Sequence, residues 1–330
     1  MCMNINYYPL ILKDDGKQKI LFKEGIKVNT KDDYLKLDLK INQYLNGYMP
    51  VRGKFLKFVN IPCGSCSECL TKKARDMTLR LYQEIKLHSN CWFITLTYAP
   101  ENIPLNDKGL MTLKKSDISD FNKKLKVKMS RKNIESTFKF FACGEYGEKN
   151  FHPHYHGIYY DLNIPDLKYF KTLNGKIYYT SEFLSSVWKK GFITISQGNL
   201  FDIAYVAQYV EKKQILNKSQ KDYIKYKYHI EPEFQFGSKH LGINILDDII
   251  YKIDKNIYNY YCNGKSYSIP KYIRNYLPDE YREKIIEDYS KKIGLVNLNR
   301  NIRVLDNVES LEYLHQFDVD KKKIRDLQFL

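Results

Sequence analysis

Residues 91–98 read Cys-Trp-Phe-Ile-Thr-Leu-Thr-Tyr and are followed by Ala99-Pro100. The stretch is rich in β-branched and aromatic residues, which predicts a buried β-strand that ends before the proline. Two other aromatic-rich stretches, residues 137–143 and 154–160, predict two more strands. The segments between them allow antiparallel pairing, and none carries a glycine-rich phosphate loop.

Helical periodicity surrounds these strands. Apolar residues recur at steps of three and four within 70–85 and 118–129, with lysines outside each stripe. Ser116 is the predicted N-cap of the second of these helices. Further helices are predicted at 181–190 and 201–213, with a strand at 192–196 between them. The predicted fold class is therefore α+β, an antiparallel sheet flanked by helices.

The chain has 330 residues, which exceeds the usual size of one domain. We predict a catalytic core at residues 70–215. An N-terminal extension, residues 1–69, carries a cysteine cluster, and residues 216–330 form a C-terminal extension to which the sequence assigns no role.

The charge balance favours a polyanionic partner. The chain carries 54 Lys and Arg against 38 Asp and Glu, a net charge of +16, together with 29 Tyr and 17 Phe. Lysines neutralise phosphates and exposed aromatic rings stack on unpaired bases, so single-stranded nucleic acid is favoured over a membrane. A solvated lysine surface encoded by an AT-rich genome is the alternative. With no signal peptide and no long apolar run, we expect a soluble intracellular protein.

Seven cysteines, an odd number, do not resemble a secreted disulfide framework. Three of them form a C-x-x-C-x-x-C pattern, a spacing suited to a structural Zn²⁺ held by thiolates. The fourth ligand is assigned to Cys2, with His88 or Cys91 as alternatives, and chance clustering of free thiols also remains open. The three clustered residues are Cys63, Cys66 and Cys69.

His154 and His156 lie two residues apart in a predicted strand, so their side chains point to the same face. Two imidazoles make half of a metal site, and hard metals that activate phosphodiesters also take oxygen ligands. Glu145 or Glu148, on the predicted turn before this strand, can supply the carboxylate, and we select Glu145. His152 is assigned as a DNA contact or an alternative ligand. Two histidines packed on a sheet are the structural alternative.

Tyr205 and Tyr209 are four residues apart in the predicted helix 201–213, so they stack one turn apart on one side. Lys212 and Lys213 continue that face. A tyrosine beside a metal-polarised phosphate can attack it, and nearby lysines stabilise the pentavalent charge. Half-buried packing of both rings is the alternative, because a chain this rich in tyrosine produces the spacing by chance.

Several segments occur together in a fixed order. They are Phe93-Ile-Thr-Leu-Thr97, Gly144-Glu-Tyr-Gly-Glu148, His152-Pro-His-Tyr-His-Gly157, Tyr205-Val-Ala-Gln-Tyr209 with Lys212-Lys213, the cysteine cluster after Pro62, Trp188 with Gly191, and Ile269-Pro-Lys-Tyr272. In order and spacing the set resembles the replication initiators of gokushovirus-type Microviridae, small single-stranded DNA phages. Those initiators belong to the HUH endonucleases. The resemblance covers most of residues 1–275.

The resemblance implies a palm-like sheet with the histidine pair on a central strand, the tyrosine helix beside it, and Mg²⁺ or Mn²⁺ between them. Thr95 and Thr97 then lie on the flanking strand. One departure is Gln208, where such proteins often place a lysine, so Lys212 or Lys213 must substitute for it here.

The implied activity is nicking of the viral strand at the phage origin. The products are a 5′-phosphotyrosine and a free 3′-hydroxyl, and later rejoining releases circular single-stranded genomes. The DNA partners are the single-stranded and replicative-form origin. Host helicase and DNA polymerase would assist in the cytoplasm of the bacterial host.

Two other functions fit parts of the sequence. A plasmid or mobile-element HUH initiator shares the chemistry but not the cysteine cluster or the late Ile-Pro-Lys-Tyr. A non-catalytic, zinc-stabilised DNA-binding regulator keeps the basic surface, with its histidines and tyrosines merely packed. Cleavage of a single-stranded origin that leaves protein on the 5′ end distinguishes an enzyme from a regulator.

Overall fold

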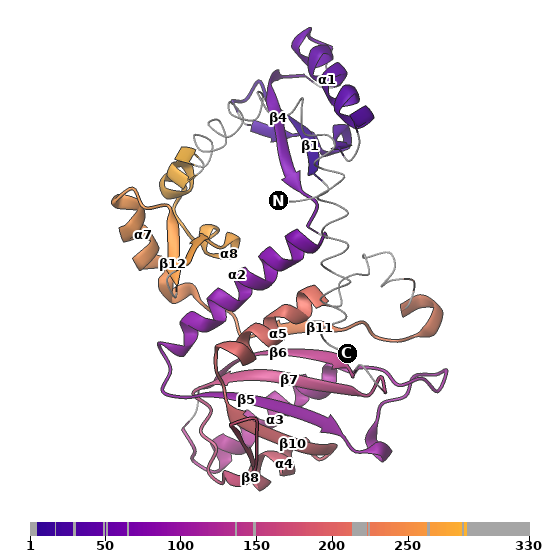
Figure 1. The fold of residues 1–330 in the computed structure, drawn as a ribbon, viewed down its shortest axis with the longest axis vertical. Coiled ribbons are helices and arrows are strands. Elements are labelled where there is room, and N and C mark those ends of the chain that lie inside the picture. Colours follow the sequence, from indigo (N-terminus) through magenta and orange to yellow (C-terminus); the bar gives the residue numbers. More distant parts are fainter. Residues whose placement is uncertain are drawn as a thin grey trace. The chain divides into compact units, whose positions relative to one another are not determined.

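The computed structural model describes residues 5–288, apart from 17, 29–30, 49, 51, 65, 136, 148–149, 213–222, 224, 263–264 and 286. Residues up to Cys69, with those from Arg282 on, form one compact unit, and Leu70–Tyr281 form the other (Figure 1). No helix within the described ranges combines the length and apolar composition needed to cross a bilayer.

The first unit contains a small antiparallel sheet and one long helix. Its central strand β1 pairs with β4 along its length, and with β2 and β3 at its two ends. Ile11, Leu21 and Tyr44 form its buried core, with Phe55 and Phe58 packed against Tyr44. The elements are β1 (Ile5–Leu12), β2 (Gln18–Ile20), η1 (Phe22–Glu24), β3 (Ile26–Val28), α1 (Lys31–Leu45) and β4 (Lys54–Pro62).

The second unit is built on a seven-stranded sheet in the order β11-β6-β7-β5-β10-β9-β8, in which every neighbouring pair is antiparallel. The strand β7 lies between β6 and β5, well inside the sheet. The strands are β5 (Cys91–Tyr98), β6 (Lys139–Tyr146), β7 (Pro153–Tyr160), β8 (Lys168–Leu173), β9 (Lys176–Thr180), β10 (Gly191–Gln197) and β11 (Phe234–Gly237).

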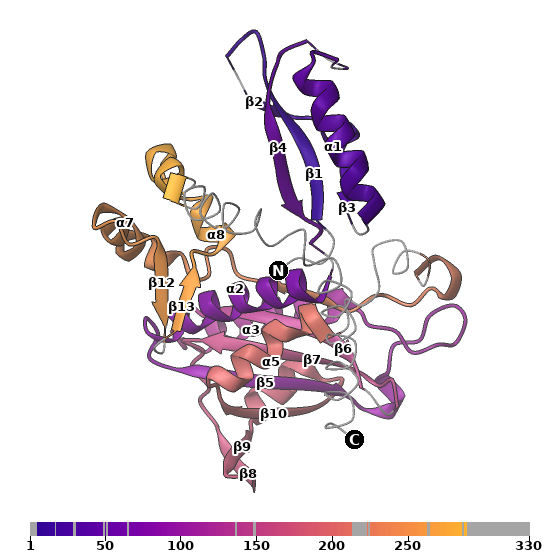
Figure 2. The same ribbon diagram turned by 45° about the horizontal axis from the view of Figure 1, so that its top comes forward.

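Helices cover both faces of this sheet (Figure 2). The four main ones are α2 (Ser67–Ile85), α3 (Lys115–Arg131), α4 (Glu182–Trp188) and α5 (Leu200–Lys212). The remaining elements of this unit are η2 (Pro100–Asn102), η3 (Ile243–Ile245), α7 (Leu246–Asp254), the hairpin β12 (Asn259–Cys262) and β13 (Lys265–Ser268), and α8 (Lys271–Arg274).

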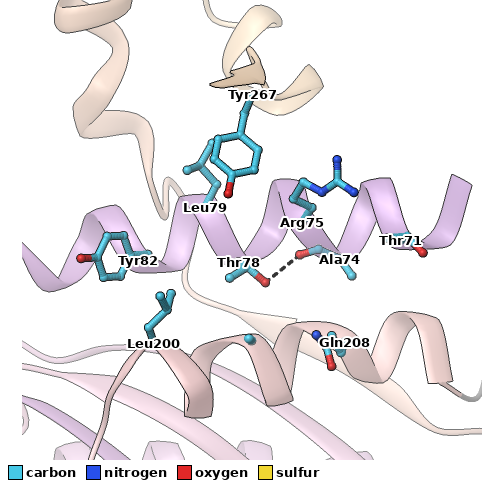
Figure 3. Close-up of a pocket in the computed structure, with 10 residues that line it drawn as sticks. Thr71, Ala74, Arg75, Thr78, Leu79, Tyr82, Leu200, Gln208 and Tyr267 are labelled. Atoms are coloured by element: carbon cyan, nitrogen blue, oxygen red, sulfur yellow. Dashed lines mark hydrogen bonds between the residues drawn. The ribbon is translucent and has the colours of Figure 1, made fainter. Parts of the chain in front are cut away.

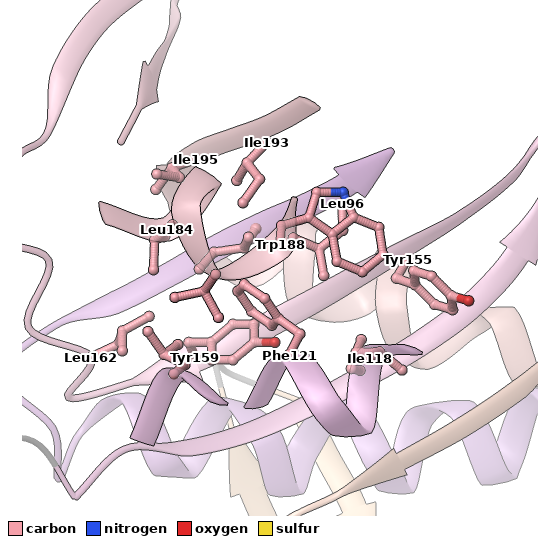
Figure 4. Close-up of a cluster of buried hydrophobic side chains, with 14 of the residues drawn as sticks. Leu96, Ile118, Phe121, Tyr155, Tyr159, Leu162, Leu184, Trp188, Ile193 and Ile195 are labelled. Atoms are coloured by element: carbon pink, nitrogen blue, oxygen red, sulfur yellow. The ribbon is translucent and has the colours of Figure 1, made fainter. Parts of the chain in front are cut away.

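The larger core lies between the sheet and the pair α3 and α4 (Figure 4). Trp188 of α4 is its centre, with ring centroids 6.2 Å from Phe121 of α3 and 6.0 Å from Tyr155 of β7. Burying an aromatic residue of this size stabilises the fold by about 3–5 kcal/mol relative to alanine. This core fixes α3 and α4 on one face of the sheet.

The opposite face packs against α2 and α5. Ile158 and Tyr160 of β7 lie here in one buried cluster with Leu81 of α2 and Val206 of α5. Side chains alternate along a strand, so Tyr155 and Tyr159 face α3 while Ile158 and Tyr160 face α5. The same alternation places His154 and His156 of β7 on the α5 face.

The predicted α+β class with an antiparallel sheet is confirmed, and the predicted strand at 91–98 coincides with β5. Three details differ. β6 continues to Tyr146, because it pairs with both β7 and β11, where a turn was predicted from Gly144 onward. The N-cap of α3 is Lys114 rather than Ser116, which lies in the first helical turn. The β8–β9 hairpin was not predicted.

Candidate active site

Three potential metal ligands converge on the α5 face of the sheet. Glu145 on β6 lies directly opposite His154 on β7 in the strand register, and His156 follows on the same face. The Oε1 atom of Glu145 is 2.5 Å from Nε2 of His154 and 2.9 Å from Nε2 of His156. Their ligand atoms lie within 4.8 Å of one another. The geometry thus brings together the three residues selected from the sequence, but Glu145 comes from a strand rather than a turn.

The hydrogen bonding of His154 points to a cation at this cluster. Its Nδ1 lies 2.9 Å from the backbone carbonyl of His152, which can only accept, so Nδ1 carries the proton. In the neutral ring, Nε2 then turns a lone pair toward the carboxylate oxygen of Glu145. Two acceptors at this distance need a proton or a metal ion between them. A backbone carbonyl behind a histidine is also the usual support of a metal ligand.

The second carboxylate oxygen of Glu145 supports the same conclusion. Glu145 is 2% exposed, and its Oε2 is buried with no hydrogen-bond partner among the described residues. Burial alone would raise the pKa of Glu145, but hydrogen bonds with His154 and His156 outweigh it and lower the pKa to about 2. Burial lowers the pKa of His156. An ionised carboxylate and a neutral imidazole are the forms that bind metal.

The orientation of His156 is fixed from two sides. Thr95, opposite it on β5, places Oγ1 2.9 Å from Nδ1. Phe93, two residues earlier on the same face, stacks on the ring with a centroid distance of 5.3 Å and an interplanar angle of 9°. The predicted position of Thr95 beside the site is confirmed, whereas the stacking of Phe93 was not predicted.

Tyr205 reaches the cluster from α5. Its hydroxyl donates to Oε1 of Glu145 at 3.3 Å, and its ring lies edge-on to His156 at 5.3 Å. The backbone of Tyr209 and Lys212 belongs to the same helix, but their side chains lie outside the described residues, as do Lys213 and Glu148 entirely. A nucleophile is thus placed at the ligand cluster by Tyr205.

A lysine and an aspartate beside the cluster were missed by sequence reasoning. Lys176 of β9 forms an ion pair with Asp202 of α5, and its Nζ lies 5.0 Å from the ring centroid of Phe93. The spacing of Asp202 and Tyr205, three residues apart on a helix, was the available signal. Lys176 had no local signal, because its strand was not predicted.

Gln208, the departure from the expected lysine, lines a cavity of about 230 Å³ between α2 and α5 (Figure 3). Thr78, Tyr82 and Leu200 also line it. The residues lining this cavity include none of the three candidate metal ligands. The cavity is therefore separate from the chemistry at Glu145.

The predicted cysteine cluster also forms in the structure, within the first unit. The sulfur atoms of Cys63, Cys66 and Cys69 lie within 4.8 Å of one another. The backbone N–H of Cys66 donates to the sulfur of Cys63 at 3.2 Å, a bond that stabilises a thiolate. Cys2 lies outside the described residues.

The two alternative fourth ligands have other environments. His88 lies between Glu84 and Asp161, at 2.8 and 2.6 Å. Burial raises the pKa of Cys91 to about 12, which keeps it a thiol. Within the described part of the chain, three thiols are thus available for a metal ion.

Comparison with known proteins identifies relatives. Residues 91–214 match a family model of phage replication-associated proteins, described by its member ORF2. The chain is 28% identical over 316 residues to the replication-associated protein ORF2 of Spiroplasma virus 4, which covers 92% of each chain. It is 29% identical over 239 residues to the replication-associated protein VP4 of Bdellovibrio phage phiMH2K, covering 71% of this chain and 72% of that one.

A third relative is the replication-associated protein ORF4 of Chlamydia phage 1, 28% identical over 233 residues, or 69% of this chain and 55% of that one. No solved structure gives a significant match. The matched family segment, 91–214, contains the candidate metal ligands and Tyr205. The resemblance found in the sequence is confirmed: the chain is a relative of the replication-associated proteins of Microviridae-type phages.

Proposed function

We propose that this chain is a rolling-circle replication initiator of the HUH type, which nicks the viral strand of phage DNA at the origin. The observation that carries the proposal is the position of Tyr205, whose hydroxyl lies 3.3 Å from the carboxylate of Glu145 in the ligand cluster. A phenol is a weak nucleophile, so a tyrosine held at a candidate metal site is the arrangement that phosphodiester attack requires.

The residues fit a hard divalent cation, Mg²⁺ or Mn²⁺, because they combine one carboxylate with two imidazoles. Glu145, His154 and His156 would hold it. A bound divalent cation polarises the scissile phosphate and stabilises the charge that develops on it. Thr95 and the carbonyl of His152 keep the two imidazoles in the orientation that binds metal.

The reaction balances with the chain's own groups. The Oη atom of Tyr205 attacks the phosphorus, the bond from phosphorus to the 3′ oxygen breaks, and the leaving oxygen takes a proton to become a 3′-hydroxyl. The proton of the phenol already points at Oε1 of Glu145. Rejoining reverses these steps when a 3′-hydroxyl displaces the tyrosine and releases circular single-stranded DNA.

Tyr209 is assigned as the second nucleophile, because it follows Tyr205 by one helical turn. Two tyrosines allow one to attack a new junction while the other still holds DNA. Lys212 and Lys213 would then stabilise the phosphate charge. These three roles follow from the sequence resemblance.

The cysteine cluster would hold a structural Zn²⁺, with Cys2 as fourth ligand. Three thiols within 4.8 Å match the tetrahedral thiolate sites of that metal. Zinc would pin the amino terminus to the start of α2, and it would take no part in the nicking step.

The DNA partners would be the single-stranded and replicative-form origins. The relatives are replication-associated proteins of phages, which favours a phage initiator over a plasmid or mobile-element one. Host helicase would unwind the duplex and host polymerase would extend the 3′-hydroxyl, in the cytoplasm of the bacterial host.

A covalent-adduct assay tests the proposal. Labelled single-stranded oligonucleotides that tile the phage genome are incubated with the protein and Mn²⁺, then separated on a denaturing gel. One oligonucleotide should give a protein-sized band that carries the 5′ end of the cleaved product. The double variant Tyr205→Phe/Tyr209→Phe should lose the band, while the matched control Tyr226→Phe, at an exposed tyrosine, should keep it. A wild-type protein that binds DNA without forming an adduct would support the regulator instead.

A further inference from the structure

The β8–β9 hairpin carries an unusual surface for the edge of a sheet. It follows β10 in the strand order and lies at the end of the sheet (Figure 2). All six residues of β8 are exposed. Among them, Phe170 is 44% exposed and contacts Phe192 of β10, which is 49% exposed, at a centroid distance of 5.4 Å. Two adjoining phenylalanines are thus open to solvent.

Lysines and aromatic rings alternate from this pair back to the candidate active site. The Nζ of Lys171 lies 5.3 Å from the ring of Phe170 and 5.9 Å from that of Tyr178. The Nζ of Lys176 lies 5.9 Å from Tyr178 and 5.0 Å from Phe93, and Phe93 stacks on His156. We name this set the aromatic–lysine track: Phe93, Lys176, Tyr178, Lys171, Phe170 and Phe192.

Strand register places the track on the same face as the metal ligands. Thr95, which contacts His156, is two residues from Phe93, and Phe93 lies opposite Ser196 of β10. Ser196 in turn lies opposite Tyr178 of β9. Directly paired residues project to one face, so the track leads from His156 across the sheet to the hairpin.

The composition of the track matches one kind of ligand. A polymer with flat bases and a phosphate at each step needs rings for stacking and ammonium groups for its charge, and proteins bind unpaired strands with this combination. A buried protein interface is instead depleted in lysine at its core. The pairing of Lys176 with Asp202 holds its ammonium group beside the cluster.

We propose that the aromatic–lysine track binds the single-stranded DNA that enters or leaves the nicking site. Bases stack on Phe170, Phe192 and Tyr178, and phosphates pair with Lys171 and Lys176. This inference rests on the proposed nicking function for the identity of the strand, but its contacts need no chemistry at Tyr205.

The test is binding of a fluorescein-labelled oligonucleotide of about twenty thymidines, measured by fluorescence anisotropy in EDTA so that no cleavage occurs. Phe170→Ala and Phe192→Ala should each weaken binding by about tenfold, the usual loss for one stacking ring. The matched control is Tyr169→Ala, because Tyr169 is 65% exposed on the same strand but pairs with Tyr179, whose ring packs against the opposite core. That variant should bind within about twofold of the wild type.

A charge variant gives a second measurement. Lys171→Gln should lower the slope of log affinity against log salt by about 0.7, the value for one phosphate contact on a single strand. The control Lys124→Gln, at an exposed lysine of α3 on the other side of the sheet, should leave the slope unchanged. Unfolding temperatures of all variants should match the wild type, because the replaced side chains are exposed.

The outcomes separate this inference from the proposed function. If Phe170→Ala and Phe192→Ala bind the thymidine oligonucleotide as tightly as Tyr169→Ala, or the wild type does not bind it, the track is not a strand path. An adduct on origin DNA would then still support nicking. If the two variants lose binding but the wild type forms no adduct, the strand path stands and the nicking function fails.

Discussion

Glu145 and His154 face each other across the β6–β7 ladder, with Oε1 of one 2.5 Å from Nε2 of the other. Since the opposite nitrogen of His154 donates to a backbone carbonyl, this short contact joins two groups that share the need for a cation. His156 and Tyr205 meet the same carboxylate oxygen at 2.9 and 3.3 Å. One carboxylate therefore organises both the candidate metal ligands and the candidate nucleophile.

Removing the charge of Glu145 should weaken metal binding. We expect Glu145→Gln to lower the affinity for Mn²⁺ by about tenfold or more, because an amide replaces an ionised ligand of nearly the same shape. Isothermal titration calorimetry with Mn²⁺ measures the change. The control Glu101→Gln alters an exposed glutamate outside the cluster. An Mn²⁺ affinity that is equal in both variants would show that Glu145 is no ligand.

Thr95→Val tests the support of His156. The hydroxyl contacts Nδ1 at 2.9 Å, and valine keeps the side-chain shape while removing that partner. We expect Mn²⁺ affinity to fall by about 10–100-fold, as for other groups that orient a metal-bound histidine. Thr194→Val, at the position opposite Thr95 on β10, is the matched control and should stay near the wild-type affinity. Similar losses in both variants would point to a general effect of the sheet.

Zinc content tests the cysteine cluster. Protein purified without added metal should contain about one zinc per chain by elemental mass spectrometry. Cys66→Ser and Cys2→Ser should each release it and lower the unfolding temperature. Cys91→Ala should retain the zinc, because burial raises the pKa of that thiol to about 12 and leaves it protonated. Wild-type protein free of zinc would refute the structural role, and zinc retained in Cys2→Ser alone would move the fourth ligand elsewhere.

The buried hydroxyl of Tyr155 should stabilise the fold on the face away from the site. It donates to the carbonyl of Lys114 at 2.8 Å and contacts the hydroxyl of Tyr98 at 2.7 Å. Tyr155→Phe should cost about 1–3 kcal/mol of unfolding free energy at neutral pH, because partners are left buried and unpaired. Urea unfolding measures it, and the exposed Tyr226→Phe should change it by less than about 0.5 kcal/mol.

The same variant predicts a pH dependence. Burial raises the pKa of Tyr155 to about 12, above the value of about 10 in an unfolded chain. The neutral phenol thus stabilises the folded state fully below pH 10, and that contribution is lost as the pH rises toward 12. The stability gap between the wild type and Tyr155→Phe should therefore narrow by roughly 1 kcal/mol between pH 9 and pH 11. A constant gap would mean that the phenol titrates normally.

Local sequence patterns were sufficient for the elements that make the centre of the fold. β5 is marked by its β-branched and aromatic residues, and α3 by a stripe whose members Ile118, Phe121, Leu125 and Met129 are all buried. The parity of His154 and His156 also placed both on one face. Each of these features depends on neighbours within a few residues, so the sequence carries it directly.

Features that depend on distant pairing were not predictable in the same way. β6 extends through Glu145 because Phe234, far along the chain, pairs with Gly144. The alternation of exposed and buried residues that marks a strand is missing from β8, since its whole length is exposed. Lys176 therefore had no predicted strand and no predicted role, although it lies beside Phe93. The third metal ligand was selected correctly as a residue but was placed on the wrong element.

Mapping the DNA-linked residue tests the central claim most directly. After reaction with the cleaved origin oligonucleotide and Mn²⁺, the adduct is digested with nuclease and protease, and peptide mass spectrometry locates the nucleotide-modified side chain. We predict that the modification lies on α5, at Tyr205 or Tyr209. Modification at any of the other tyrosines, or on a residue of another kind, would contradict the assignment of α5 as the helix that carries the nucleophile.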